Sequence, residues 1–172
     1  VSLVREAALV ANNACKEHLG AAFAIANLTS RVGLIHDIGG EVMQHLIALS
    51  NSGDVHDQCL AFSALGRLAS QTENRDALSS ILPALSNRIN TEQPEVRLEI
   101  AFCLCGLSKS SSYRLSMARV TISMLIEFSR RSIDFTTVRL ILNTVANIAE
   151  DINTHPILIS ANILDEILHR LS

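Results

Sequence analysis

Apolar residues recur at helical spacing in four stretches of the chain, and the four stretches share one pattern. They are HLGAAFAIANLTS (18–30), QCLAFSALGRLAS (58–70), RLEIAFCLCGLSK (97–109) and VRLILNTVANIAE (138–150). In each stretch, apolar residues stand three, six and seven positions before a final apolar residue, and these offsets mark one face of an α-helix. The final apolar residues lie 40, 39 and 41 positions apart, at Leu28, Leu68, Leu107 and Ile148. The pattern predicts four long helices in a repeat of about forty residues.

A shorter helical pattern precedes three of these stretches and recurs at the end of the sequence. It covers residues 41–50, 81–89, 121–129 and 162–172. A still shorter apolar motif, one or two helical turns long, follows each long helix, at 32–40, 74–81, 113–120 and 155–163. Short polar connections with Gly, Pro or Asp separate the patterns, as expected of turns. Each forty-residue unit is therefore predicted to hold a short, a medium and a long helix.

This order of helices resembles the armadillo repeat family. The unit from 38 to 78 reads IGGEVMQHLIAL, then LAFSALGRLAS, then ENRDAL, and FAIANLTS (23–30) and NTVANIAE (143–150) repeat its central motif. The resemblance implies an all-α fold, a right-handed α-solenoid of three-helix repeats. HEAT repeats are the nearest alternative; the separate short helix, the Gly-Gly and the Asn-Arg favour armadillo. The predicted repeats are 1–38, 39–80, 81–120 and 121–161, with a partial repeat at 162–172. Neither end has the polar face of a capping repeat, so we expect a fragment of a longer array.

In armadillo proteins the long helices line a concave groove that binds an extended peptide, because an Asn side chain can both donate to and accept from a peptide backbone. The residues that the resemblance places in this groove are Phe23, Asn27, Ser63, Arg67, Phe102, Asn143 and Asn147. Arg67 and Gly106 stand where the family pattern has Asn, which interrupts the ladder in the middle repeats. The chain has no Trp, so the lysine slots of importin-α are absent. Alternatively, Asn27 and Asn147 are buried amides that tie helices to their neighbours, and Arg67 is a solvated side chain.

Composition and spacing argue against several other classes of function. The net charge of −3 does not favour a nucleic-acid binder, and no apolar run is long enough for insertion into a membrane. Cys15 and His18 have metal-ligand spacing, but no second such pair follows, so we expect no metal. The chain lacks a phosphate-binding loop, a nucleophile elbow and paired carboxylates, so we expect no cofactor, no small-molecule substrate and no enzyme. Four cysteines without a Cys-x-x-Cys pair fit a reducing, cytoplasmic location.

Two functions are therefore predicted as alternatives, both with protein partners. The first is a scaffold or adaptor that holds an extended segment or a helix in the concave groove; the Asn residues favour it. The second is an architectural subunit of a large cytoskeletal, ciliary or organellar complex that makes contacts through its ends and its convex face. Only 18% of the residues are charged, and this low fraction, with the uncapped ends, favours the second. A regulatory domain beside a catalytic module is a third possibility.

Overall fold

The computed structural model describes residues 46–70, 81–88, 90–132 and 134–171, together with Gln44 and Leu78. Within these residues all regular structure is helical, and no strand occurs. The predicted all-α class is confirmed for this part of the chain. The first predicted long helix, with Phe23 and Asn27, and the predicted repeat 1–38 lie outside the described residues.

The helices follow one another in a regular order along the chain. A helical stretch at 46–50 comes first, followed by α4 (Val55–Ala69), α6 (Leu82–Ser86), α7 (Pro94–Ser108), the 3-10 turn η3 (Ser111–Tyr113), α8 (Arg114–Arg131), α9 (Phe135–Ala149), the 3-10 turn η4 (Ile152–Thr154), α10 (His155–Ser160) and α11 (Ile163–Leu171).

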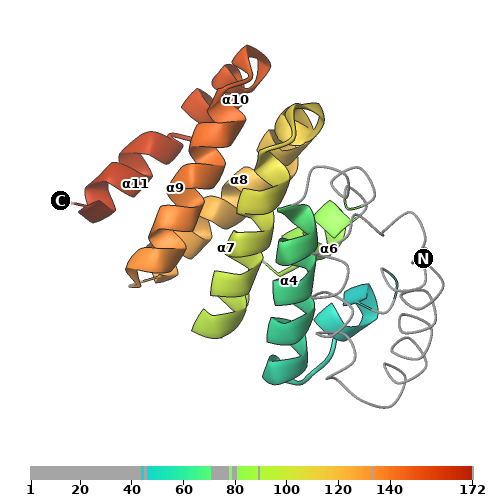
Figure 1. The fold of residues 1–172 in the computed structure, drawn as a ribbon. Helices are drawn as coiled ribbons and strands as arrows, with labels where there is room; N and C mark the ends of the chain where they lie inside the picture. The colour runs from blue at the N-terminus through green and yellow to red at the C-terminus, as the bar shows by residue number, and fades with distance from the viewer. Residues whose placement is uncertain are drawn as a thin grey trace.

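Three helices of equal length form one layer of the molecule. Each of α4, α7 and α9 has 15 residues. They lie side by side and run in the same direction, with α7 packed between α4 and α9 (Figure 1). They coincide with the long helices predicted at 58–70, 97–109 and 138–150, each beginning one turn earlier than the apolar pattern. The prediction of long helices is confirmed for these three stretches.

Local sequence explains where these three helices begin. Asp54 caps α4, because its side chain accepts hydrogen bonds from the backbone N–H groups of His56 and Asp57. Asp134 caps α9 in the same way by accepting from the N–H of Thr137 at 2.7 Å. Helix α7 has no side-chain cap and begins with Pro94, whose missing N–H costs nothing in the first turn.

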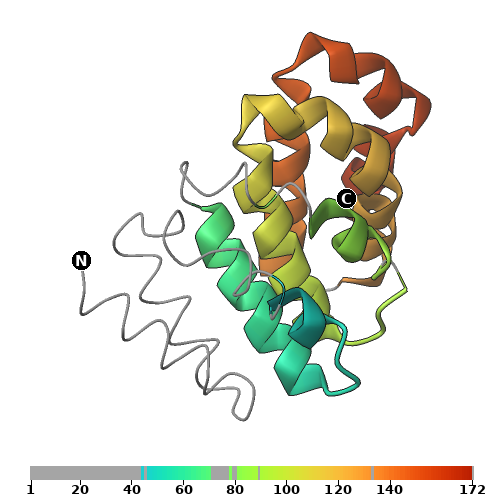
Figure 2. The same cartoon turned by 90° about the vertical axis from the view of Figure 1, so that its right-hand side faces the viewer.

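A second layer of helices covers one side of the first. It consists of α6, α8 and α11, which contact one another in that order (Figure 2). Between the layers lies one continuous apolar core, built from residues of both. Leu104 in α7, Phe128 in α8 and Ile148 in α9 are completely buried in it. Leu, Ile and Ala dominate this core, and their compact side chains suit closely packed helices.

The third predicted unit differs from the expectation in one respect. The sequence predicted separate helical segments at 113–120 and 121–129 and a repeat boundary after residue 120, but α8 runs unbroken from Arg114 to Arg131. No Gly or Pro interrupts this stretch, and Thr121 donates its hydroxyl to the carbonyl of Met117 within the helix, at 2.8 Å. In the following unit α10 and α11 are separate, because Asn162 between them has a φ of 50°. Asn tolerates that left-handed conformation better than most residues.

Arginine side chains connect successive units across the layers. Arg88 donates to the carbonyl of Ser50 at 2.5 Å, and Arg97 donates to the carbonyls of Thr91 and Glu92 and to that of Arg131. Arg97 is 6% exposed, so it acts as a buried donor to carbonyls at helix ends. Two ion pairs, Arg114 with Glu150 and Arg130 with Glu166, also join residues of neighbouring units.

Candidate functional surface of the long helices

The three long helices can be compared residue by residue, because they have equal length and similar packing. In each one the seventh, eleventh and fourteenth residues are buried in the core, as Ile100, Leu104 and Leu107 are in α7. With 3.6 residues per turn, the ninth and thirteenth residues point to the opposite side. We call this side the outer face. Its ninth and thirteenth residues are Ser63 and Arg67 in α4, Phe102 and Gly106 in α7, and Asn143 and Asn147 in α9.

The contact between α4 and α7 is apolar and very close. A Cβ atom on Gly66 would lie 2.8 Å from Cε1 of Phe102, so the Phe102 ring lies directly over Gly66. A Cβ atom on Gly106 would lie 2.9 Å from Cβ of Ala69 and 3.0 Å from its carbonyl carbon. Both glycines therefore let the helices approach to a distance that any side chain would prevent. This contact accounts for Gly106, where the resemblance implied Asn.

A polar contact on the outer face also joins α4 to α7. The carboxyl group of Glu99 forms a hydrogen bond with Ser63 and lies close enough to Arg67 to interact with its charge. Partial burial raises the pKa of Glu99, while the Ser63 hydrogen bond and the Arg67 charge act in the opposite direction. The outer face between these helices thus holds an acid and a base beside the half-buried ring of Phe102.

The contact between α7 and α9 is polar by comparison. Nδ2 of Asn147 donates to Oγ of Ser108 at 2.9 Å, and the Ser108 hydroxyl donates in turn to the carbonyl of Cys105. Cys105 also forms a side-chain hydrogen bond with Thr144. Asn147 is half-buried and joins its helix to a neighbouring helix, which is close to the alternative reading of this residue. The bond to Ser108 uses one of the two N–H groups of its amide.

The predicted groove residues therefore fall into two groups. Asn143 and Arg67 are exposed on the outer face, whereas Ser63, Phe102 and Asn147 are half-buried where two helices meet. Sequence reasoning missed Glu99, although it stands three residues before Phe102 and so shares its face of the helix. It missed Thr144 and Ser108 as well, because nothing in their own helix indicates a partner in the next one.

The described cysteines are free thiols in apolar surroundings. Cys103 is fully buried, and burial, with a smaller effect from the negative charge of Glu99, raises the pKa of its thiol far above the ordinary value. Burial also raises the pKa values of Cys59 and Cys105. A thiol with a raised pKa is a poor nucleophile at neutral pH, since the thiolate is the reactive form.

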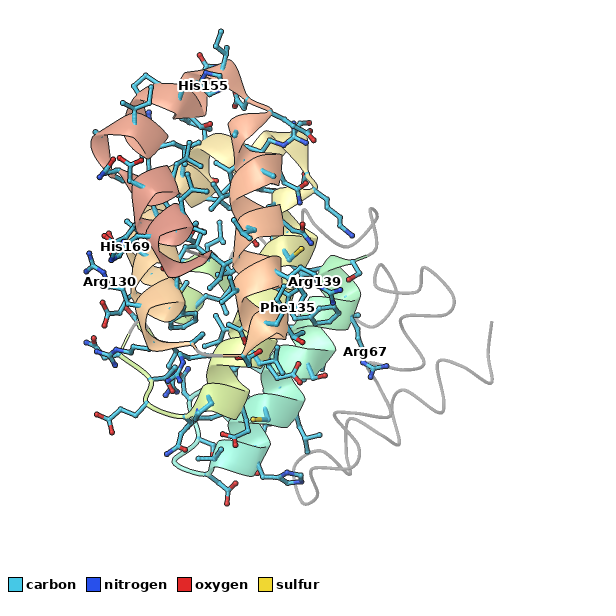
Figure 3. The ribbon with its side chains drawn as sticks, turned by 90° about the vertical axis from the view of Figure 1, so that its left-hand side faces the viewer. Arg67, Arg130, Phe135, Arg139, His155 and His169 are labelled. Atoms are coloured by element: carbon cyan, nitrogen blue, oxygen red, sulfur yellow. The ribbon has the colours of Figure 1, made fainter. Side chains whose placement is uncertain are left out.

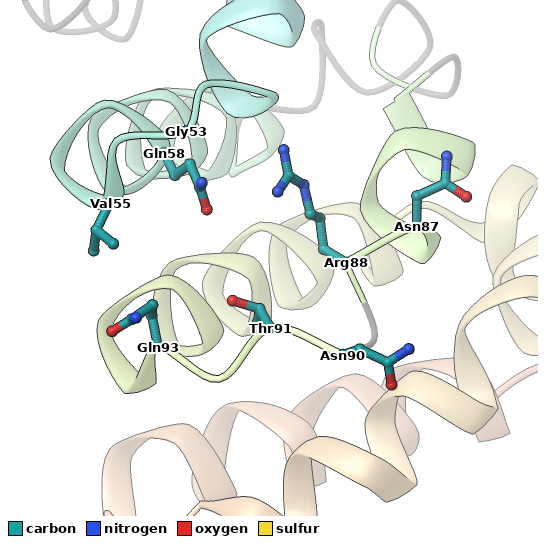
Figure 4. A pocket seen from close by; sticks show the side chains of 8 residues that line it. All are labelled: Gly53, Val55, Gln58, Asn87, Arg88, Asn90, Thr91 and Gln93. Atoms are coloured by element: carbon teal, nitrogen blue, oxygen red, sulfur yellow. The ribbon is translucent and has the colours of Figure 1, made fainter.

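A cleft of about 320 Å³ opens at the edge of the molecule where the loops before α4 and α7 meet (Figure 4). Its lining is polar and consists of Gly53, Val55, Gln58, Asn87, Arg88, Asn90, Thr91 and Gln93. Arg88 and Gln58 point toward each other across it, but both side chains donate to loop carbonyls, those of Ser50 and Ser52. The lining holds no acid, histidine or thiol, so it offers no acid–base pair.

Within the described residues, no group of three His, Cys, Asp or Glu side chains is placed to hold a metal ion. No described helix combines the length and apolar character needed to cross a membrane. The sequence matches no family model and no curated protein.

Proposed function

We propose that this chain is a protein-interaction scaffold of the armadillo type, which binds an extended segment of a partner across the outer face of α4, α7 and α9. The observation that supports this proposal most directly is the parallel alignment of three equal helices with polar and aromatic residues at equivalent positions. Helices packed side by side are about 8–10 Å apart. An extended peptide rises about 3.3 Å per residue, so every third residue of the peptide would meet the next helix.

The residues of the outer face suit such a ligand. Asn143 is exposed, and its amide can pair with both the N–H and the C=O of a peptide backbone. Phe102 offers part of an aromatic ring to an apolar side chain of the ligand. Arg67 and Glu99, on neighbouring helices, favour a segment that carries charges of both signs rather than a purely basic one.

Random peptides displayed on phage, selected on the whole chain, provide the test. We expect the selected peptides to bind with micromolar affinity, and Asn143→Ala and Arg67→Ala each to weaken binding by about fivefold to tenfold, as loss of a hydrogen bond to a charged or polar group does. Fluorescence polarisation measures the affinities. Ser123→Ala, on the exposed side of α8, is the matched control. Selected peptides that bind both outer-face variants as well as the unmodified chain would contradict the proposal.

A further inference from the structure

A second surface lies on the side of each long helix that faces the next one along the chain. It contains the fifth, eighth, twelfth and fifteenth residues, and we call it the forward face. Its residues are Cys59, Phe62, Gly66 and Ala69 in α4, Leu98, Ala101, Cys105 and Ser108 in α7, and Arg139, Leu142, Ala146 and Ala149 in α9.

The contacts described above place each helix on the forward face of the one before it. Phe102 and Gly106 of α7 lie on Gly66 and Ala69 of α4. In α9, Thr144 and Asn147 lie on Cys105 and Ser108 of α7. The eighth, twelfth and fifteenth residues are consequently buried in both α4 and α7.

The forward face of α9 differs, because none of the described helices covers it in this way. Ala146 is exposed, and Leu142 and Ala149 are only half-buried. Phe135, at the start of the same helix, is 74% exposed. Beside it, Leu164 and Leu168 of α11 are each 59% exposed. Figure 3 looks toward α9 and α11 from this side, with Phe135 and Arg139 labelled on α9.

The packing of α9 itself indicates what fits here. Helix α9 rests on α7 and on α8 at once, and α11 follows α8 in the second layer. A helix placed on α9 and α11 would therefore continue the arrangement that the chain already uses. We propose that the forward face of α9, with Leu164 and Leu168, is a docking site for an amphipathic helix of a partner protein, which lies parallel to α9.

The composition of this face indicates the chemistry of the docked helix. Ala146 and Ala149 are small and apolar, as Gly66 and Ala69 are in α4, whereas the equivalent residues of α7 form polar contacts. The docked helix therefore resembles α7, with Gly at its thirteenth position. Its ninth residue is smaller than Phe, because the Phe102 ring occupies space that a Cβ at the twelfth position, as in Ala146, would fill.

Charge gives the same answer. Glu95 and Glu99 of α7 lie near Cys59 on the forward face of α4 and contribute to its raised pKa. Arg139 occupies the equivalent position of α9, so acids at the second and sixth positions of the docked helix would face a cation. A second copy of this chain fits less well, because a two-fold pairing of α9 helices would bring together two faces that carry Arg139 and no acid.

A synthetic peptide tests the proposal directly. The probe is residues 94–108 with Phe102→Leu, Cys103→Ala and Cys105→Ala, labelled with fluorescein and titrated with the whole chain. We expect saturable binding that Ala146→Arg weakens at least tenfold, because the added side chain occupies the contact. Both Ala146 and Arg139 are exposed, so variants at these positions should keep the fold, as circular dichroism would verify. Ser123→Arg adds the same charge on α8 and should leave binding unchanged.

A charge exchange tests the orientation of the helix. Arg139→Glu should weaken binding of the probe at least tenfold, and a probe that also carries Glu95→Lys and Glu99→Lys should recover most of that loss. Absence of saturable binding at millimolar concentration, or equal weakening by Ser123→Arg, would overturn the proposal. A dimer in analytical ultracentrifugation that Ala146→Arg dissociates would also overturn it, since the occupant would then be a second copy. None of these results depends on the peptide ligand proposed for the outer face.

Discussion

Helix α7 meets α4 on one side and α9 on the other, and the two contacts use different chemistry within one geometry. Toward α4 the contact consists of a ring over a glycine and of a glycine against an alanine backbone. Toward α9 it consists of hydrogen bonds, from Asn147 to Ser108 and between Thr144 and Cys105. Equivalent positions thus accept either close apolar packing or a polar bond, provided that both partners change together. The difference predicts that mutations at equivalent positions have unequal effects.

The largest effect is expected where a backbone leaves no space. Gly106→Leu places a Cβ atom about 3 Å from the backbone of Ala69 and Ser70, which cannot rotate away. Overpacking of this kind costs about 3 kcal/mol, offset by about 1 kcal/mol of helix propensity, so we expect a net loss of about 2 kcal/mol in the free energy of unfolding. Urea unfolding followed by circular dichroism measures it. Gly53→Ala is the control, because no atom lies within 4 Å of that position, and an equal loss in both variants would contradict the prediction.

A smaller effect is expected at the other glycine of the same contact. Gly66→Ala collides with the ring of Phe102, which is half-buried and can move aside at a cost. We expect a loss of about 1 kcal/mol in the free energy of unfolding. When Phe102→Ala is already present, the collision disappears and Gly66→Ala should instead stabilise the helix by up to about 1 kcal/mol. A double-mutant cycle in urea measures this change of sign, and additive effects would show that the ring does not lie over Gly66.

The polar contact should respond to loss of either partner by a similar amount. Asn147→Ala and Ser108→Ala each remove the bond between α9 and α7, and we expect each to cost about 1 kcal/mol of unfolding free energy. The double variant should lose little more than either single one, because one interaction is removed only once. Thermal unfolding with Ser123→Ala as a surface control measures these values. Full additivity would indicate that the two side chains act independently.

The smallest effect concerns pH. The pKa of Glu99 is higher in the folded protein than in the unfolded chain, so the unfolded chain releases this proton first as pH rises. The contribution of Glu99 to stability is therefore most favourable at low pH and decreases as pH rises through the two pKa values. Glu99→Gln keeps the amide near Ser63 without the charge. We expect its stability relative to the unmodified chain to rise between pH 4 and pH 7 in urea unfolding. A constant difference across that range would contradict the direction of the shift.

The long helices could be predicted from sequence because their signals are local. Apolar residues at offsets of three, six and seven define α4, α7 and α9, and Asp54, Pro94 and Asp134 define their beginnings. The candidate surface could be predicted only in part. Asn143 and Arg67 are on the exposed outer face as expected, but the partners of Phe102 and Asn147 lie on another helix, about forty positions away in the sequence.

The sequence by itself determined the helical class, the forty-residue period and the sides of each helix that are apolar, because these depend on neighbours within a few turns. Tertiary structure decided the rest. It made α8 one helix where the short motif and the medium helix were expected to be separate, and it placed Glu99 beside Ser63. It buried the forward face of α7 and left Ala146 of α9 exposed, although the two helices have the same pattern. The physical reason is that burial depends on which helix lies alongside, and no residue encodes that alone.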